Sequence, residues 1–300
     1  VFPAAYIQDI NADFKPDVLA APTFGSNESE GNVVNTRSSF WYYKQQGSVS
    51  NPDYVLQTKR FLQETMVDVG EEASPCFIDI DGDGDLDLLI GNRGLPQADN
   101  QFYGSVFLYR NTGGSTAPAF VLETDDYLNL SALRWRRIKP VVGDINNDGK
   151  PDLLILGNPQ GAAAATTISN LYLNTAPVGQ MPVFTLSTVS FPINFGPYDH
   201  PLFTDVDGDG KADMLLAKFD GRVFYYRNTG GSGQISLDLE TTAFGGLTTS
   251  IHHRNPSIAV GDYNGDGNSD LAHISERGVL RIAFHYRQQN ISQFTWDSLV

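Results

Sequence analysis

Five short segments of this chain place oxygen-bearing side chains at regular positions. Each is nine residues long, with Asp or Asn at positions 1, 3 and 5 and Asp at position 9. Ca²⁺ takes about six to eight oxygens from carboxylates, side-chain amides and backbone carbonyls. The residue type at position 7 varies, as expected if only the backbone carbonyl of this residue binds the ion. We therefore predict calcium loops, with the candidate ligands Asp9, Asn11, Asp13, Lys15 and Asp17; Asp79, Asp81, Asp83, Asp85 and Asp87; Asp144, Asn146, Asp148, Lys150 and Asp152; Asp205, Asp207, Asp209, Lys211 and Asp213; and Asp262, Asn264, Asp266, Asn268 and Asp270.

Position 6 of the loop is where the chain must turn sharply around an ion, which favours glycine. Four of the loops have Gly84, Gly149, Gly210 and Gly267 there, and the first has Phe14. The prediction is therefore four Ca²⁺ sites from Asp79 onward and a fifth, at Asp9, that departs from the pattern. The loops are similar to the start of an EF-hand loop but lack its acidic position 12. Because the flanking residues are strand-like, we do not expect a helix–loop–helix.

An alternative interpretation is that these loops are ordinary acidic turns, since Asp, Asn and Gly dominate turns. Their repetition in register argues against it. The side-chain ligand positions hold 17 of the 35 acidic residues. So many clustered carboxylates would repel one another without cations. Five Ca²⁺, with two charges each, would bring the formal net charge from −15 to −5.

Composition narrows the classes of partner. A net charge of −15 and a pI near 4.5 argue against nucleic acid, whose partners carry basic surfaces. The single Cys76 excludes an internal disulfide and a zinc cluster of cysteines, and we expect it in the core. Weak calcium sites suit the extracellular medium, which favours an exported protein. Neither a signal peptide nor an apolar run long enough for a membrane span is visible, so we expect a mature or excised portion.

The acidic loops recur at intervals that fall from 70 to 57 residues, which indicates a repeating structural unit. In the second unit we expect strands at 76–80, 87–91, 105–110 and 120–123. The third strand ends in aromatic residues and an Asn-Thr-Gly turn. Four strands per unit at this period predict an all-β propeller without helices. We expect a single β-propeller domain over residues 1–300, with blades at about 3–70, 71–136, 137–197, 198–253 and 254–300.

The loops and the blade pattern together resemble the FG-GAP or VCBS repeats of integrin-α-like β-propellers, over nearly the whole chain. The runs 108–120 and 122–131 further resemble large surface and secreted proteins of Bacteroidota, many exported by the type IX system. The C-terminal sorting domain of such cargo is not in this sequence. The resemblance implies a secreted or cell-surface location. Rings of this family commonly have seven blades, so the five units either close a small ring or form part of a larger one.

Connectivity assigns the loops to two faces. In an up-and-down blade the 1–2 and 3–4 turns share one face, and the 2–3 and 4–1 loops share the other. The calcium loops are 1–2 connections. The opposite face carries 2–3 loops of variable length, at 25–38, 95–104, 159–169 and 219–222. Variable loops on a rigid scaffold are where function concentrates.

The 4–1 loops on that opposite face are rich in Arg, Trp, Tyr and His, several of which are favoured at binding hot spots. The basic cluster of Arg134, Arg136 and Arg137 would suit an anionic sugar or a carboxylate. The alternative is that these side chains only pack or solvate the blade ends. The candidate ligand-binding residues are Arg134, Trp135, Arg136, Tyr198, His200, His252 and Arg254.

Three functions remain open. The leading hypothesis is a non-enzymatic extracellular recognition or adhesion module that binds protein or glycan. The second is a polysaccharide lyase or hydrolase, with an acid–base set drawn from His200, His252 and His253 and from Tyr198 or Asp199. No nucleophile elbow, zinc motif or phosphate loop supports it, and adjacent histidines alternate faces in an extended chain. The third is a structural subunit of a larger surface assembly.

Overall fold

The structure is a computed structural model of the chain, and its described residues form an all-β fold. It describes residues 4–11, 13–21, 40–48, 50–61, 66–97, 101–114, 117–162, 166–196, 198–250 and 254–298. Five sheets have four antiparallel strands each, and each sheet follows chain order apart from one inserted hairpin. The predicted fold class, an all-β chain of five four-stranded propeller-type blades, is confirmed.

The strands of each sheet follow one another along the chain. The first two sheets contain β1 (Ala4–Gln8), β2 (Asp17–Ala21), β3 (Trp41–Gln45) and β4 (Tyr54–Thr58), then β5 (Ser74–Ile78), β6 (Asp87–Gly91), β9 (Val106–Asn111) and β10 (Phe120–Thr124). The third contains β11 (Trp135–Gly143), β12 (Asp152–Pro159), β13 (Ile168–Asn174) and β14 (Phe184–Leu186). The last two contain β15 (His200–Thr204), β16 (Asp213–Ala217), β17 (Val223–Asn228) and β18 (Leu237–Thr241), then β19 (Ser257–Gly261), β20 (Asp270–Ile274), β21 (Leu280–Ala283) and β22 (Asp297–Ser298).

Burial follows strand position within each sheet. In the four sheets from β5 onward most residues of the second strand are buried, and every residue of β16 is buried. Such strands are continuous apolar runs because both of their faces are covered. The fourth strand is an exposed edge, as in β10, where four of the five residues are exposed. This gradient places the second strands between neighbouring sheets and the fourth strands at the outside of the molecule.

The core lies between successive sheets, and the connections between them help to fill it. Leu130 is buried between the second and third sheets, Phe191 and Phe195 between the third and fourth, and Phe244 between the fourth and fifth. Two of these connections form short 3₁₀ segments, η2 (Tyr127–Leu133) and η3 (Phe244–Gly246). A third 3₁₀ segment, η4 (Tyr286–Gln288), lies within the last sheet, between β21 and β22. The sequence did not predict them, because segments this short carry no helical periodicity.

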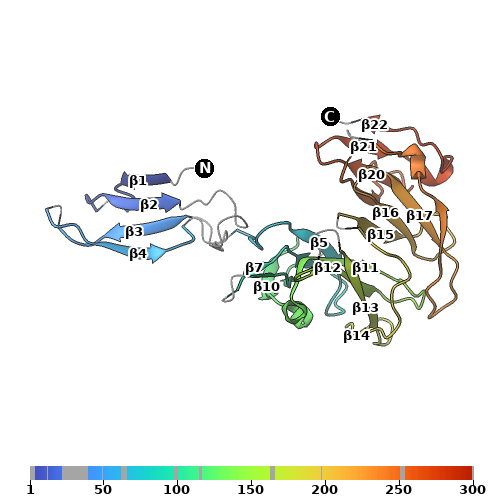
Figure 1. Cartoon of the computed structure of the whole chain (residues 1–300), viewed down its shortest axis with the longest axis horizontal. Coiled ribbons are helices and arrows are strands. Elements are labelled where there is room, and N and C mark those ends of the chain that lie inside the picture. The colour runs from blue at the N-terminus through green and yellow to red at the C-terminus, as the bar shows by residue number, and fades with distance from the viewer. Residues whose placement is uncertain are drawn as a thin grey trace.

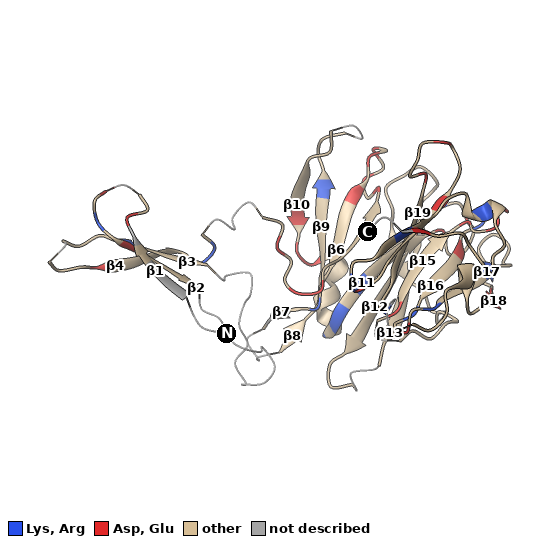
Figure 2. Ribbon diagram, turned by 90° about the horizontal axis from the view of Figure 1, so that it is seen from above, with Lys and Arg blue, Asp and Glu red and all other residues tan. Residues whose placement is uncertain are grey.

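The four sheets from β5 onward form an arc. Their first strands, β5, β11, β15 and β19, are neighbours in that order and line a common cavity of about 520 Å³. Figures 1 and 2 both show the sheet β1–β4 standing apart from this arc. Among the described residues, the four buried apolar clusters contain none from 4–61. A closed five-bladed ring, one of the two predicted arrangements, is therefore not what the structure shows.

The outer face of the second sheet explains why the first sheet is not packed there. Ile90, Phe107 and Tyr109 form this face, and Val69 and Leu95 cover it. Leu95 belongs to the inserted hairpin of β7 (Leu95–Pro96) and β8 (Phe102–Tyr103), which forms the long 2–3 loop of this blade. The chain thus covers with its own connections the surface that a preceding blade would bury.

Some predicted boundaries shift. The expected blade boundary at 136 lies inside β11. The run Phe294–Trp296, which has the apolar residues of a fourth strand, lies just before β22 (Asp297–Ser298), because Phe294 and Trp296 pack into the apolar cluster between the last two sheets. Cys76 lies in β5 and packs against the core, where burial raises its pKa to about 12. None of the described helical segments is long and apolar enough to cross a membrane.

Candidate functional site

The acidic loop between β5 and β6 is held by its own backbone. The carboxylate of Asp79 accepts hydrogen bonds from the amides of Gly82 (2.7 Å) and Gly84 (3.0 Å). Asp81 accepts one from the amide of Asp83 (3.2 Å), and Asp83 one from the amide of Asp85 (2.9 Å). These successive turns wrap the chain around the carboxylates, as Asp side chains commonly do in turns.

All five loops share this fold, including the one that departs from the pattern. In each, the position-1 carboxylate accepts a bond from the position-6 amide; that distance is 2.8 Å from Phe14 to Asp9. The position-6 residue has a positive φ in every loop, +91° at Gly84 and +66° at Phe14. Glycine adopts this conformation without strain, whereas phenylalanine does not. The predicted turn at position 6 is confirmed, and the first loop adopts it despite Phe14.

The position-9 aspartate has a structural role that the sequence did not reveal. Asp87 is almost fully buried and accepts hydrogen bonds from the amides of Ile80 (2.9 Å) and Asn111 (2.7 Å). The same pair of bonds, to the position-2 amide and to the end of the third strand, recurs in every loop. The signal available in the sequence is the recurrence of Asp at position 9, which the sequence analysis assigns to metal binding alone.

Carboxylate oxygens converge in two loops. Single oxygens of Asp79, Asp81 and Asp87 lie within 4.8 Å of one another, as do those of Asp205, Asp207 and Asp209. In the other three loops an asparagine stands at position 3 in place of the aspartate. A set of hard oxygen donors on a tightly turned loop fits Ca²⁺.

Crowded carboxylates in these loops also attract basic side chains. Arg110 lies 3.2 Å from both Asp81 and Asp87, and Arg227 lies 2.7 Å from Asp207. A carboxylate offers about four acceptor positions, so such contacts are compatible with a metal ligand. Burial raises the pKa of Asp152 to about 6, and a bound cation would reverse this shift.

The two predicted faces are present. On one, the 2–3 and 4–1 connections bond to each other, as where the amide of Asn255 donates to the carbonyl of Phe219 (2.9 Å). On the other, the acidic loop around Gly84 and the 3–4 turn around Pro177 line one cavity of about 440 Å³. The acidic loops therefore lie on the opposite side from the predicted ligand-binding residues.

Trp135 is a correction to the predicted ligand-binding set. Its side chain is only 7% exposed and packs in the cluster between the second and third sheets. Gly157 makes room for it, since a Cβ there would lie 2.7 Å from the indole ring. The sequence identified a tryptophan in a connection but could not tell that it points inward.

Two members of the predicted basic cluster, Arg134 and Arg137, have different partners. Arg134 lies over the ring of Tyr103 (5.4 Å), and Arg137 pairs with Glu72 (2.8 Å). Arg136 forms part of β11, next to a bulge in its pairing with β12. Arg134 and Arg137 are thus each engaged with a neighbour of their own. The remaining candidates His252 and His253 lie outside the described residues.

A second polar cluster, formed by Lys139 and His200, borders a cavity that Arg137 also lines. Lys139 of β11 donates from Nζ to the carbonyl of Asp199 (2.8 Å), and its Nζ lies 3.0 Å from Nδ1 of His200. Burial lowers the pKa of Lys139 to about 8 and that of His200 to about 4, so the imidazole is neutral at pH 7. The cluster borders a cavity of about 420 Å³, lined by Glu72, Ala73, Ser74, Arg137, Ile138, Lys139, Tyr198, His200 and Asn255.

Sequence reasoning placed His200 and Tyr198 on this face but missed Lys139. The available signal was a lysine inside the apolar run that starts at Ile138. Asp199, a candidate acid or base, is buried and accepts bonds from the amide of Gly196 (2.7 Å) and from Lys218. Its carboxylate is thus engaged within the fold.

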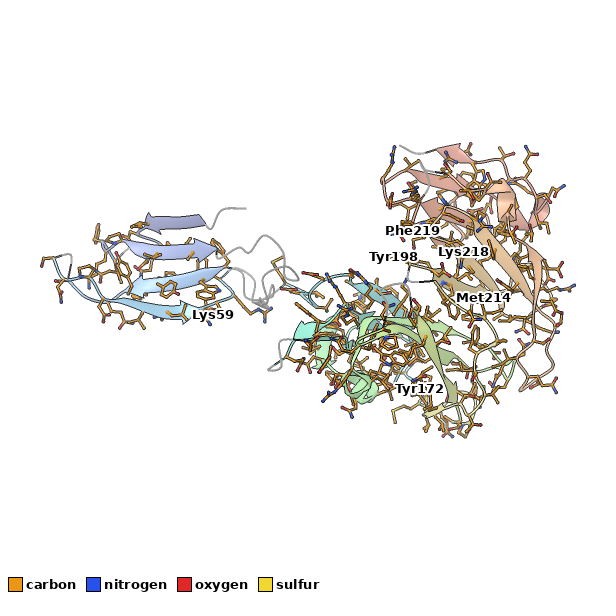
Figure 3. All side chains as sticks on the ribbon, in the orientation of Figure 1. Lys59, Tyr172, Tyr198, Met214, Lys218 and Phe219 are labelled. Atoms are coloured by element: carbon orange, nitrogen blue, oxygen red, sulfur yellow. The ribbon has the colours of Figure 1, made fainter. Side chains whose placement is uncertain are left out.

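Two exposed aromatic rings lie beside this cavity. Tyr198 and Phe219 are 38% and 41% exposed, with ring centroids 5.2 Å apart. The guanidinium of Arg137 lies over Tyr198 (5.6 Å) and that of Arg254 over Phe219 (5.9 Å). We call Arg137, Tyr198, Phe219 and Arg254 the aromatic ridge. Figure 3 shows Tyr198 and Phe219 close together at one end of β15 and β16, with Lys218 beside them.

Comparison with known proteins identifies the repeats. The family model of the FG-GAP-like repeat matches residues 79–155 and 205–273, so the chain contains FG-GAP-like repeats in these two regions. No curated protein matches. Among solved structures, one similar chain is an Agrocybe aegerita lectin, described by its specific recognition of non-reducing terminal N-acetylglucosamine. It is 18% identical with a TM-score of 0.40; the match covers 99% of this chain and 66%, just under two thirds, of that chain. At this score the likeness carries no argument about function.

Proposed function

We propose that this chain, with its FG-GAP-like repeats at 79–155 and 205–273, is an extracellular recognition module braced by calcium and without enzymatic activity. It binds a glycan or a protein through the face formed by the 2–3 and 4–1 connections. The observation that carries the proposal is a cavity on this face, bordered by Lys139 and His200 and flanked by exposed Tyr198 and Phe219.

The chemistry of the acidic loops supports the calcium part. The loop carboxylates would hold the ion, and the bound Ca²⁺ would neutralise their charge. Asp87 and its equivalents tie each loop to the third strand, so an ordered loop also orders the blade. Since the unfolded chain lacks the site, Ca²⁺ would stabilise the native state by mass action. The modest affinity of such sites suits an extracellular setting, where Ca²⁺ is abundant.

The opposite face has the usual properties of a binding site. Ligand cavities are concave and largely apolar, with a few convergent polar groups. The rings of Tyr198 and Phe219 provide apolar surface, and Lys139 and His200 provide the polar groups. These four residues lie in or next to packed strands, which limits the motion of their side chains.

The test is a glycan array combined with a pull-down from extracellular protein fractions. Replacing both Tyr198 and Phe219 by alanine should weaken binding by about tenfold or more, since aromatic anchors dominate interfaces. Phe14→Ala is a matched control, because Phe14 is 92% exposed but lies in an acidic loop. Equal binding by the double variant and the wild type would refute the assignment of this face.

A role as subunit of a larger assembly is a second candidate. The sheet β1–β4 stands outside the arc, and three of the five residues of β2 are only partly buried. In β16, the equivalent strand, all five are buried. Light scattering after size-exclusion chromatography tests this role. A defined oligomer favours it, whereas a monomer at all concentrations would exclude an assembly formed by copies of this chain.

A further inference from the structure

Among the described residues, Lys139 has no direct ion pair to balance its charge. Its ammonium contacts a backbone carbonyl and the neutral imidazole of His200. The two nearby carboxylates are engaged elsewhere: Asp199 with Lys218, and Glu72 with Arg137. Within the described part of the chain, no carboxylate forms an ion pair with Lys139.

A desolvated, unpaired ammonium is unfavourable, and proteins normally pair such groups. Lysine has three N–H donors, and the two contacts of Lys139 leave one of them for a further acceptor. The group borders the 420 Å³ cavity, so an acceptor entering from solvent can reach it. An anionic acceptor fits best, because it would supply the missing charge as well as the hydrogen bond.

The aromatic ridge defines the rest of the ligand. Tyr198 lines the same cavity as Lys139, and Phe219 extends the apolar surface away from it. The rings are inclined by 37° and are braced by Arg137 and Arg254 at the two ends. Such a surface fits a saturated ring with one apolar face of C–H groups, which lies against it while the polar groups of the ring face water.

We infer that the cavity binds a sugar residue that carries a carboxylate, with the carboxylate on Lys139 and the sugar ring against Tyr198 and Phe219. This inference rests on the proposed recognition function and names its ligand class. An acidic sugar combines one anionic group with a rigid C–H face within a few ångströms. An acidic peptide would present its carboxylates on flexible side chains and would leave the ridge without a matching ring.

Affinity is compared by calorimetry on the full chain, with oligosaccharides that differ only in ending in glucuronate or in glucose. We expect the glucuronate form to bind about tenfold more tightly or better, the effect of one charge-assisted hydrogen bond. Lys139→Met should abolish this preference, and Lys139→Arg should retain part of it. Lys59→Met is the control, since Lys59 lies over Trp41 in the separate first sheet. Near-ultraviolet circular dichroism confirms that each variant is folded.

Equal affinity for the two oligosaccharides, or an unchanged preference in Lys139→Met, would overturn the inference and leave the proposed function standing. Binding of glutamate-rich peptides without binding of either sugar would also overturn it, in favour of a protein partner. Two results together support it: Phe219→Ala loses binding of both sugars, and Lys139→Met, with Phe219 intact, loses only the preference for glucuronate. If the face binds neither glycans nor proteins, the proposed function itself fails.

Discussion

Single side chains in this protein serve both the fold and the candidate sites. Asp87 is a possible metal ligand, yet both of its carboxylate oxygens already bond backbone amides. Lys139 lies in a strand that packs against its neighbours, yet its ammonium borders a cavity. In both cases a charged group is buried, which costs free energy, and such groups are typical of functional positions.

Asp87→Asn should destabilise the protein by about 1–3 kcal/mol even in EDTA. The amide retains one acceptor oxygen, so one of the two buried backbone donors, on Ile80 or Asn111, loses its partner. Urea unfolding measures the effect. Asp85→Asn is the control, because Asp85 is only partly buried and lies outside the pair of bonds that Asp87 makes to Ile80 and Asn111; equal stability of the two variants would contradict the structural role.

Phe14→Gly should stabilise the first sheet by up to about 1 kcal/mol, since it relieves a left-handed φ and costs some chain entropy. Hydrogen exchange of the β2 amides reports it. Phe14→Ala keeps the strained φ while removing the ring. Slower exchange in the glycine variant alone is expected, and slower exchange in both would assign the effect to the exposed ring instead.

Binding of an acidic sugar should weaken as pH rises through about 8, the lowered pKa of Lys139. The protonated amine binds the carboxylate, so affinity is full below that pH and is lost above it. The charged neighbours, Glu72, Asp199 and Arg137, are paired in the structure, and His200 stays neutral because its pKa is about 4. Calorimetry from pH 6 to pH 9.5 tests this; Lys139→Arg should show no such decline, and a decline in that variant would point to another group.

At the scale of elements, close backbone contact between strands joins the blades. Gly91 ends β6, where a Cβ would lie 2.1 Å from the carbonyl oxygen of Ile138 and 2.6 Å from Pro140. Neither contact can relax without moving β11, the first strand of the next blade. The glycine thus allows two sheets to approach at the point where the cavity-bearing strand begins.

Gly91→Ala should therefore destabilise the arc by about 1–3 kcal/mol through overpacking. Thermal and urea unfolding measure it. Gly114→Ala is the matched control, because the nearest atom to its Cβ is 3.8 Å away. If Gly91→Ala is as stable as Gly114→Ala, the two sheets are not in the close contact described.

Much of the element pattern was predictable from the sequence, and the reasons are physical. The acidic loops and the Asn-Thr-Gly turns recur, and between them the apolar runs are too short for helices, so β6, β9 and β10 were predicted within about one residue. The hairpin β7–β8 and the 3₁₀ segments were missed, because each is set by contacts rather than by a local pattern. The inward direction of Trp135 and the partners of Lys139 likewise depend on the neighbouring sheet.

At the scale of the molecule, the sequence could not decide how the blades assemble. Five similar repeats predict five similar sheets, and the structure has them. Ring closure depends on surfaces far apart in the chain, and here Val69 and Leu95 cover the one that a preceding blade would bury. The arc places the acidic loops and the aromatic ridge on opposite faces, so the proposed calcium sites and the proposed binding surface are separate.

Calcium bound in the acidic loops would stabilise the blades that carry the proposed binding face. Thermal melting of the full chain in EDTA, followed by addition of millimolar Ca²⁺, tests it most directly. We expect a clear rise in Tm on adding Ca²⁺, reversed by chelation and reduced when Asp205 and Asp207 are both replaced by asparagine. An identical Tm in EDTA and in Ca²⁺ would contradict it.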